Sequence, residues 1–198
     1  SASCTAPAIL QDLAGTAQLR MERTICYWTD WISRCRYVVP WQREVRRSAL
    51  ALKLLTYAPS GAIIAAPTTS LPEDPGGLRN WDYRYCWLRD ASFTVRALLS
   101  LGFRGEADAY MNWILHATRL TRPRLQILYS VFGRTDLAEK ELPWLNGYRD
   151  SRPVRIGNGA SGQLQLDVYG EVLDAIYVYS RHVAAFDRST RKFILQLG

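Results

Sequence analysis

Residues 79–93 read RNWDYRYCWLRDASF, and this stretch marks the junction between a long loop and a helix. Aromatic and charged side chains alternate as far as Asp90. From Ala91 onward apolar residues return at helical spacing up to Leu101, and Gly102 stands where a left-handed residue commonly ends a helix. The stretch therefore predicts a helix whose N-terminal end carries a candidate functional loop.

The loop ahead of this junction, residues 68–80, is rich in proline and glycine, too polar for a core and too long for a simple turn. The side chains that follow it are those that a sugar site needs. Flat aromatic rings pack on the apolar faces of a pyranose, while Arg and Asp form directional hydrogen bonds with hydroxyls. In the alternative interpretation the aromatic residues anchor the core, and Asp90 is the N-cap of the following helix with Arg89 as its exposed neighbour. Residue types alone leave both interpretations open.

Farther from the junction, apolar residues recur at helical spacing in several segments. The predicted helices span residues 20–36, 41–57, 91–101, 105–118 and 167–182, with a last helix after Ser189 as its N-cap. Residues 125–131 are predicted to form a short strand, and residues 136–159 are predicted to be irregular. The chain is therefore predicted to be all-α in its main elements, built of helical hairpins joined by long loops.

The last predicted helix begins to show an apolar face, with Phe193, Ile194 and Leu197, shortly before the sequence ends. We expect from this either that the chain is a fragment of a longer domain or that another copy of the chain covers the open helical face.

The composition is that of a globular protein: 198 residues, 48% hydrophobic and 22% charged. The net charge is +7, but the basic residues are nearly all arginine and are scattered, and the densest group, residues 43–47, is typical of a solvated helix face. We therefore expect no nucleic-acid partner. An anion-binding protein is a weaker alternative, and it would require binding that depends strongly on salt.

The four cysteines form no C-x-x-C pair and the two histidines stand alone, so neither a metal site nor a disulfide framework is predicted. No stretch approaches the roughly 18 apolar residues of a membrane helix. The N-terminal residues also lack the basic start and apolar block of an export signal. We expect a cytoplasmic protein that needs no membrane and no cofactor.

Three segments together resemble glycoside hydrolase family 15, the glucoamylases and trehalases, in its bacterial form. Residues 79–93 resemble the family signature, residues 54–73 the segment ahead of it, and residues 147–171 the next long loop and helix. The resemblance implies an (α/α)6 barrel, in which six outer helices surround six inner ones and loops at one end form the active site. About half of that barrel is expected here, over residues 20–198, after an N-terminal extension of residues 1–19.

The resemblance also implies which residues bind the sugar. Arg89 and Asp90 match the pair that holds the hydroxyls of the terminal glucose, and Tyr83 and Trp87 match the aromatic positions beside them. Two residues of the later loop are expected to line the same pocket, namely Arg155 and Asp167. Their alternative roles are a structural salt bridge for Arg155 and an N-cap for Asp167.

Inverting hydrolysis of a glycosidic bond needs a carboxylic acid and a carboxylate about 6.5–9.5 Å apart. In this family the acid lies in a Trp-Glu motif, and no Trp-Glu pair occurs in this sequence. Four other glutamates are candidate substitutes, and none matches a catalytic position: Glu106, Glu139, Glu141 and Glu171. No catalytic residue is therefore predicted, and the 198-residue chain alone is expected to be inactive.

The resulting hypothesis is that the chain is part of a hydrolase. When complete, that hydrolase cleaves terminal α-glucosidic bonds of trehalose, a maltooligosaccharide or an isomaltoside. The alternative is a non-catalytic module that binds sugar or associates with itself as a half-barrel.

Overall fold

The computed structural model describes residues 13–38, 40–182 and 185–197. The chain divides into two compact units, Ser1–Cys35 and Arg36–Gly198. In the first unit, helix α1 (Leu13–Ser33) begins earlier than the helix predicted over residues 20–36. Residues 1–12 of the expected N-terminal extension lie outside the described residues, and the extension stays a prediction. No helix within the described ranges is both long and apolar enough to cross a membrane.

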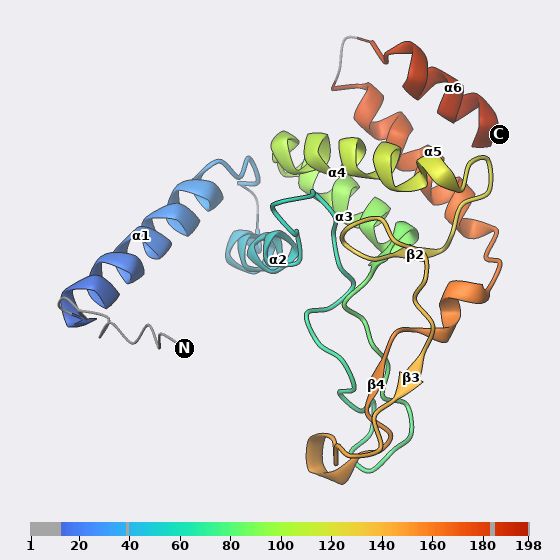
Figure 1. Ribbon diagram of the computed structural model, residues 1–198. Helices are drawn as coiled ribbons and strands as arrows, with labels where there is room; N and C mark the ends of the chain where they lie inside the picture. Colours follow the sequence, from blue (N-terminus) through green and yellow to red (C-terminus); the bar gives the residue numbers. More distant parts are fainter. Residues whose placement is uncertain (1–12, 39, 183–184, 198) are drawn as a thin grey trace, which may run out of the picture. The chain divides into compact units, whose positions relative to one another are not determined.

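The second unit is mostly helical, as predicted. Its helices are α2 (Gln42–Leu54), α3 (Leu88–Ser100), α4 (Arg104–Ala117), α5 (Asp167–Ser180) and α6 (Arg188–Leu197). Helix α3 packs against both α4 and α5 (Figure 1). It does so because apolar residues at helical spacing bury one side of it, among them Leu88, Ala91, Val95 and Leu98. Consecutive helices α3 and α4 thus form a hairpin, as the sequence indicates.

The turn between α3 and α4 requires a left-handed backbone conformation, which explains why a glycine stands at its centre. Gly102 has a φ of +93°. Its amide donates to the carbonyl of Leu99 at 3.0 Å, and the amide of Phe103 donates to the carbonyl of Leu98 at 2.8 Å. These two bonds are the Schellman arrangement that ends a helix on a left-handed residue. The predicted C-cap is confirmed.

One helix start and one capping role in this unit differ from the prediction. Helix α3 begins at Leu88 rather than Ala91, because Leu88 is itself fully buried and joins the apolar side of the helix. Asp90 therefore lies inside the first turn and is not the N-cap. Helix α5 begins at Asp167, as predicted, so Asp167 is the first residue of the helix and not its N-cap.

Helix α6 also differs at its start. Asp187, not Ser189, takes the capping role, because its carboxylate accepts a hydrogen bond from the Thr190 amide at 2.7 Å. Its apolar residues Phe193 and Leu197 are buried in the core cluster of the same chain. Ile194 of the same face is partly buried against that cluster, and its coverage by a second copy of the chain stays a prediction.

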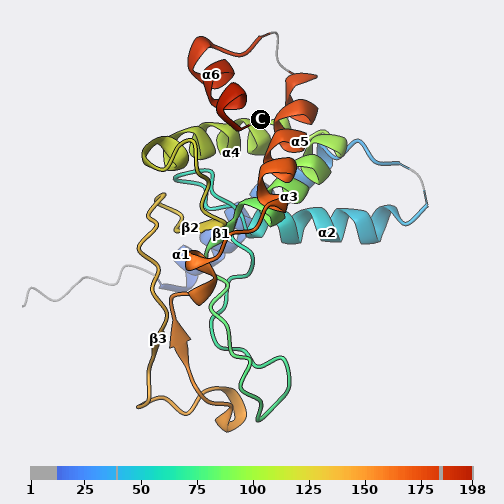
Figure 2. The same ribbon diagram turned by 90° about the vertical axis from the view of Figure 1, so that its right-hand side faces the viewer.

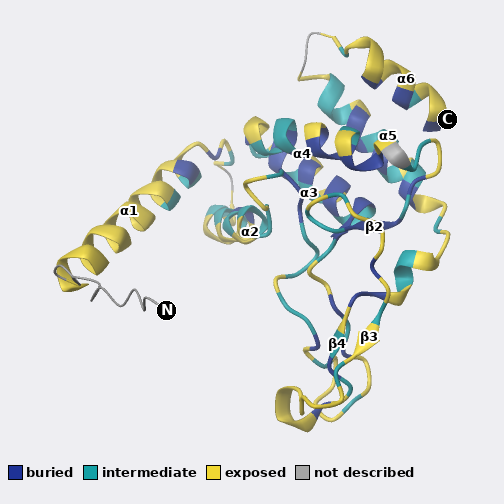
Figure 3. Cartoon of the chain, in the orientation of Figure 1, coloured by how far each residue is buried: buried dark blue, intermediate teal, exposed yellow. Residues whose placement is uncertain are grey.

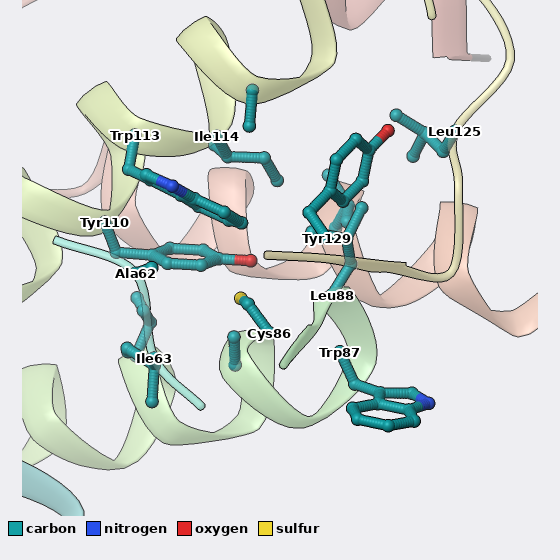
Figure 4. Packing of buried hydrophobic residues seen from close by; sticks show 14 of the residues in the cluster. Ala62, Ile63, Cys86, Trp87, Leu88, Tyr110, Trp113, Ile114, Leu125 and Tyr129 are labelled. Atoms are coloured by element: carbon teal, nitrogen blue, oxygen red, sulfur yellow. The ribbon is translucent and has the colours of Figure 1, made fainter. Parts of the chain in front are cut away.

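The core of the second unit lies between the helices and a two-stranded sheet (Figure 3). Strand β1 (Cys86–Trp87) pairs antiparallel with β2 (Leu128–Tyr129), a shorter strand than the one predicted over residues 125–131. Figure 4 shows Cys86, Tyr110, Trp113 and Tyr129 packed together, with the indole of Trp87 at the edge of the group. Trp87 can therefore anchor the core and still border an open site.

Two segments, residues 65–85 and 137–158, leave the helices side by side and form a structure that we call the arm (Figures 1 and 2). Within it, strand β3 (Lys140–Glu141) pairs antiparallel with β4 (Arg155–Ile156). The segments are joined by hydrogen bonds from Thr69 and Ser70 to the backbone of Arg155. Residues 136–159 are thus largely irregular, as predicted, but are fixed by their partner segment.

Candidate functional site

Arg89 lies in the first turn of α3, and acceptors from two helical regions hold its guanidinium. Its Nε donates to Asp90 Oδ1 at 2.9 Å. Its Nη1 donates to Gln165 Oε1 at 3.2 Å and to Asp167 Oδ2 at 3.3 Å. Arginine has five N–H donors, and the two on Nη2 form no hydrogen bond with any described residue. This edge of Arg89 is therefore free to bind an external acceptor.

The electrostatics of this group favour a fixed cation. Burial lowers the pKa of the Arg89 guanidinium, but the carboxylates of Asp90 and Asp167 outweigh that effect and raise it. Both carboxylates stand in the first turn of a helix, where the helix dipole stabilises negative charge. The result is a preorganised cluster of one cation and two anions, with donors and acceptors on its open side.

Aromatic side chains form one wall of a cleft that adjoins this cluster. The ring centroids of Tyr83 and Trp87 are 5.8 Å apart. They border an open cleft of about 500 Å³, whose lining residues are Trp81, Tyr83, Trp87, Glu139, Asn158, Gly159, Ala160 and Gln163. The pKa of Tyr83 is raised by burial and then by the negative charges of Glu73 and Asp90, which places its phenol within the field of the Arg89 cluster.

Two glutamines join the cleft to the Arg89 cluster. Gln165 accepts from Arg89 through Oε1 and donates through Nε2 to Gln163 Oε1 at 3.1 Å. Gln163 in turn lines the cleft. The sequence pattern does not single out either residue, although both lie in the segment 163–171 that resembles the family. The one sequence feature that could have indicated these glutamines is their position just ahead of α5.

Arg155 does not join the Arg89 cluster. Its guanidinium forms ion pairs with Glu139 Oε1 at 3.2 Å and Glu141 Oε1 at 3.4 Å. It also donates to the Leu78 carbonyl at 2.9 Å, and it lies over the Trp81 ring at 4.9 Å from the centroid. Only 12% of its side chain is exposed. The salt bridge that the sequence offers as its alternative role is therefore present.

The buried carboxylate of Asp82 holds the two segments of the arm together. It accepts two hydrogen bonds from the Arg84 guanidinium at 2.8 Å and one from the Gly157 amide at 3.2 Å. The Asn158 side chain donates to the backbone carbonyl of Asp82 at 3.1 Å. Because Trp81 and Tyr83 flank Asp82 and line the cleft together with Asn158, these bonds fix lining residues of the two segments against each other.

The structure thus places the six predicted residues in three groups. Arg89, Asp90 and Asp167 form the polar cluster, Tyr83 and Trp87 form the adjoining aromatic wall, and Arg155 stands in a separate ion-pair group. The sequence pattern does not reveal that Glu139 and Asn158 line the cleft, because both lie in the irregular segment. In the part of the chain that the structure describes, no three His, Cys, Asp or Glu residues lie close enough together to hold a metal ion.

The class of protein follows from a comparison with known families. The model of the family described as Glycosyl hydrolases family 15 matches residues 42–197, from the start of α2 to the end of α6. This is most of the chain, and the chain belongs to glycoside hydrolase family 15.

The relatives that this chain resembles include several trehalases. It is 48% identical over 166 residues to the trehalase of Mycolicibacterium smegmatis and 46% identical over 166 residues to that of Mycobacterium tuberculosis. It is 44% identical over 163 residues to the trehalase of Thermoplasma acidophilum. Each match covers 82% of this chain but only 25%, 24% and 28% of the respective relative. The chain spans about a quarter of the length of the curated relatives it matches. No solved structure gives a significant match.

Proposed function

We propose that this chain supplies part of the glucose-binding subsite of a family 15 hydrolase that cleaves the α-glucosidic bond of trehalose. The second unit is then part of an (α/α)6 barrel, and the cleft lies at the loop end of its helices. Trehalose takes precedence over maltooligosaccharides and isomaltosides because the relatives at 40–48% identity are named trehalases.

The open edge of Arg89 beside an aromatic cleft is the observation that carries this proposal. A pyranose ring presents apolar faces to aromatic rings and hydroxyls at its rim. In the proposed complex Tyr83 and Trp87 stack on the sugar, and the Nη2 hydrogens of Arg89 donate to a hydroxyl oxygen. Asp90 and Asp167 accept from neighbouring hydroxyls with the carboxylate lone pairs that Arg89 leaves unused.

Trehalose binding by the 198-residue chain tests the proposal. Arg89→Ala and Asp90→Ala are each expected to weaken binding by about 1–3 kcal/mol, or about 5- to 150-fold, because each removes a charge-assisted hydrogen bond. Arg96→Ala is the matched control, since the Arg96–Asp174 ion pair at 3.0 Å also joins α3 to α5 but lies away from the cleft. Equal affinities in all three variants would refute the subsite.

Glucose release separates the proposal from its alternative roles. The proposal expects the chain to bind trehalose and release no glucose from trehalose, maltose or isomaltose, because its sequence contains no recognisable catalytic pair. Turnover that persists after repurification would show that carboxylates of this chain perform the reaction. A non-catalytic module with a different sugar preference would instead show tighter binding of another glucoside than of trehalose.

A further inference from the structure

The cleft holds one carboxylate that neither the sequence pattern nor the family resemblance assigns to the sugar. Glu139 lines the same cleft as Trp81, Tyr83 and Trp87, and 27% of its side chain is exposed. Its neighbour Glu141 contacts the same arginine but does not line the cleft, and 61% of its side chain is exposed. Both glutamates therefore contact Arg155, but only Glu139 lines the cleft.

Two contacts fix the Glu139 carboxylate. Its Oε1 lies 3.2 Å from Arg155 Nε, and its Oε2 accepts from the Gly159 amide at 3.3 Å. Each carboxylate oxygen has about two acceptor positions, so these contacts leave lone pairs directed elsewhere. A carboxylate that is both ion-paired and hydrogen-bonded loses little freedom on binding, and this favours its use as a fixed acceptor.

The same arginine also contacts an aromatic residue that lines the cleft. Arg155 lies over the Trp81 ring at 4.9 Å and donates to the Leu78 carbonyl at 2.9 Å. Arg155 therefore contacts two residues that line the cleft, Trp81 and Glu139, and holds both of them.

We propose that Glu139 is a further sugar-contacting residue, whose carboxylate accepts hydrogen bonds from glucose hydroxyls, and that Arg155 is the positioning residue that aims Glu139 and Trp81 at the sugar. This inference rests on the proposed function, because it takes a glucoside as the occupant of the cleft. It assigns Arg155 an indirect role in place of the direct contact that the family resemblance suggests. Glu139 acts only as an acceptor, so it selects ligands with a hydroxyl donor at this point.

Trehalose titration of Glu139→Gln and Glu141→Gln provides the test. Glu139→Gln is expected to weaken binding about tenfold or more, the loss of a hydrogen bond to a charged group, whereas Glu141→Gln changes it less than about twofold. Glu139→Asp provides a second variant if the first fails to fold, because it keeps the charge and withdraws the carboxylate from the cleft. Equal affinities in the Glu139 and Glu141 variants would overturn the inference.

Mono-deoxy glucoses identify the hydroxyl and need only the wild type and one variant. The deoxy sugar that lacks the hydroxyl contacted by Glu139 is expected to bind the wild type more weakly, with no further loss in Glu139→Gln. If every deoxy sugar loses the same factor in both proteins, Glu139 makes no direct contact and the inference fails.

The indirect role of Arg155 is tested by a double-variant cycle. Arg155→Lys keeps the charge but not the planar fork, so it is expected to weaken trehalose binding. The loss should be smaller when Glu139 is already Gln, because only the part that acts through Trp81 remains. Additive losses would mean that Arg155 acts independently of Glu139. Arg89→Ala in the same series separates the two proposals. If Arg89→Ala weakens binding and Glu139→Gln does not, the inference alone fails, and if the wild type binds no sugar, both fail.

Discussion

Arg89 and Asp167 are 78 residues apart in the sequence, yet Arg89 Nη1 lies 3.3 Å from Asp167 Oδ2. This ion pair joins the first turns of α3 and α5 at the end of the helices that faces the cleft. Both side chains are partly exposed, at 35% and 47%. An ion pair of this exposure stabilises a fold by about 1 kcal/mol at most, so it contributes little to stability, and the proposed function assigns it a role in binding.

Asp167→Asn is therefore expected to affect trehalose affinity much more than the free energy of unfolding. The free energy of unfolding should change by less than about 1 kcal/mol, because the pair is exposed to solvent. Trehalose affinity should fall, because the amide is a weaker acceptor and no longer fixes Arg89 by charge. Urea unfolding and calorimetric titration measure the two effects. Asp174→Asn, which breaks the Arg96 pair, is the control, and a similar loss of affinity there would contradict the local role of Asp167.

Tyr83 offers a test of the aromatic wall. Tyr83→Phe keeps the ring and is expected to leave trehalose affinity within about twofold, whereas Tyr83→Ala should cost about 0.5–1.5 kcal/mol of binding free energy, the range of an aromatic contact. Burial, Glu73 and Asp90 raise the pKa of Tyr83, so its phenol stays protonated and affinity should not respond to this group near neutral pH. Equal losses in Tyr83→Phe and Tyr83→Ala would show that the hydroxyl, not the ring, makes the contact.

The helical part of this structure follows closely from the sequence, for a physical reason. Helix α3 carries apolar residues at the helical period, and the glycine after it satisfies a C-cap whose hydrogen bonds the structure confirms. Helix starts are harder to predict, because capping is decided by single side chains. Asp187 and Ser189 both suit an N-cap, and only the hydrogen bond from the Thr190 amide distinguishes them.

The lining residues from the irregular segment could not be predicted in the same way. Glu139 and Asn158 lie in a segment without periodicity, and their positions depend on contacts with residues far away in the sequence. Asp82 illustrates the limit most clearly, since an aspartate is expected at the surface and this one is completely buried. Its burial is possible because Arg84 and the Gly157 amide donate hydrogen bonds to the carboxylate, and no local sequence pattern predicts these bonds.

Two glycines allow a matched test of how firmly the arm is fixed. Gly157 has a φ of +78°, and a Cβ there would lie 2.1 Å from the Ala138 carbonyl oxygen. Gly157→Ala is therefore expected to lower the free energy of unfolding by more than about 1 kcal/mol and to weaken trehalose binding, because the Gly157 amide holds Asp82.

Gly170→Ala is the control for this change. Gly170 lies inside α5, and a Cβ at this position would meet no atom within 4 Å beyond the backbone of its own helix. Alanine should therefore raise the free energy of unfolding by up to about 1 kcal/mol. Urea unfolding of both variants measures the difference. Similar stabilities of Gly157→Ala and Gly170→Ala would show that the arm accommodates the extra atom by moving.

The raised pKa of Tyr179 predicts how the free energy of unfolding should respond to alkaline pH. Its hydroxyl donates to Asp108 Oδ1 at 2.6 Å, and burial followed by this hydrogen bond raises the pKa of Tyr179 to about 12 from its ordinary value of 10.0. The folded chain thus holds the phenolic proton more tightly than the unfolded chain. The stabilisation is complete below pH 10 and is lost as the pH rises towards about 12.

Tyr179→Phe should therefore lose about 1 kcal/mol of unfolding free energy at neutral pH, where the hydrogen bond to Asp108 is intact. Between pH 10 and 12 its unfolding free energy should fall less steeply than that of the wild type, because no proton is released at this position. Comparing the two proteins across the pH series cancels the other tyrosines that titrate in this range, such as Tyr85 and Tyr129, whose pKa values are also raised chiefly by burial. Parallel curves for Tyr179→Phe and the wild type would show that the Tyr179–Asp108 hydrogen bond does not link proton release to folding.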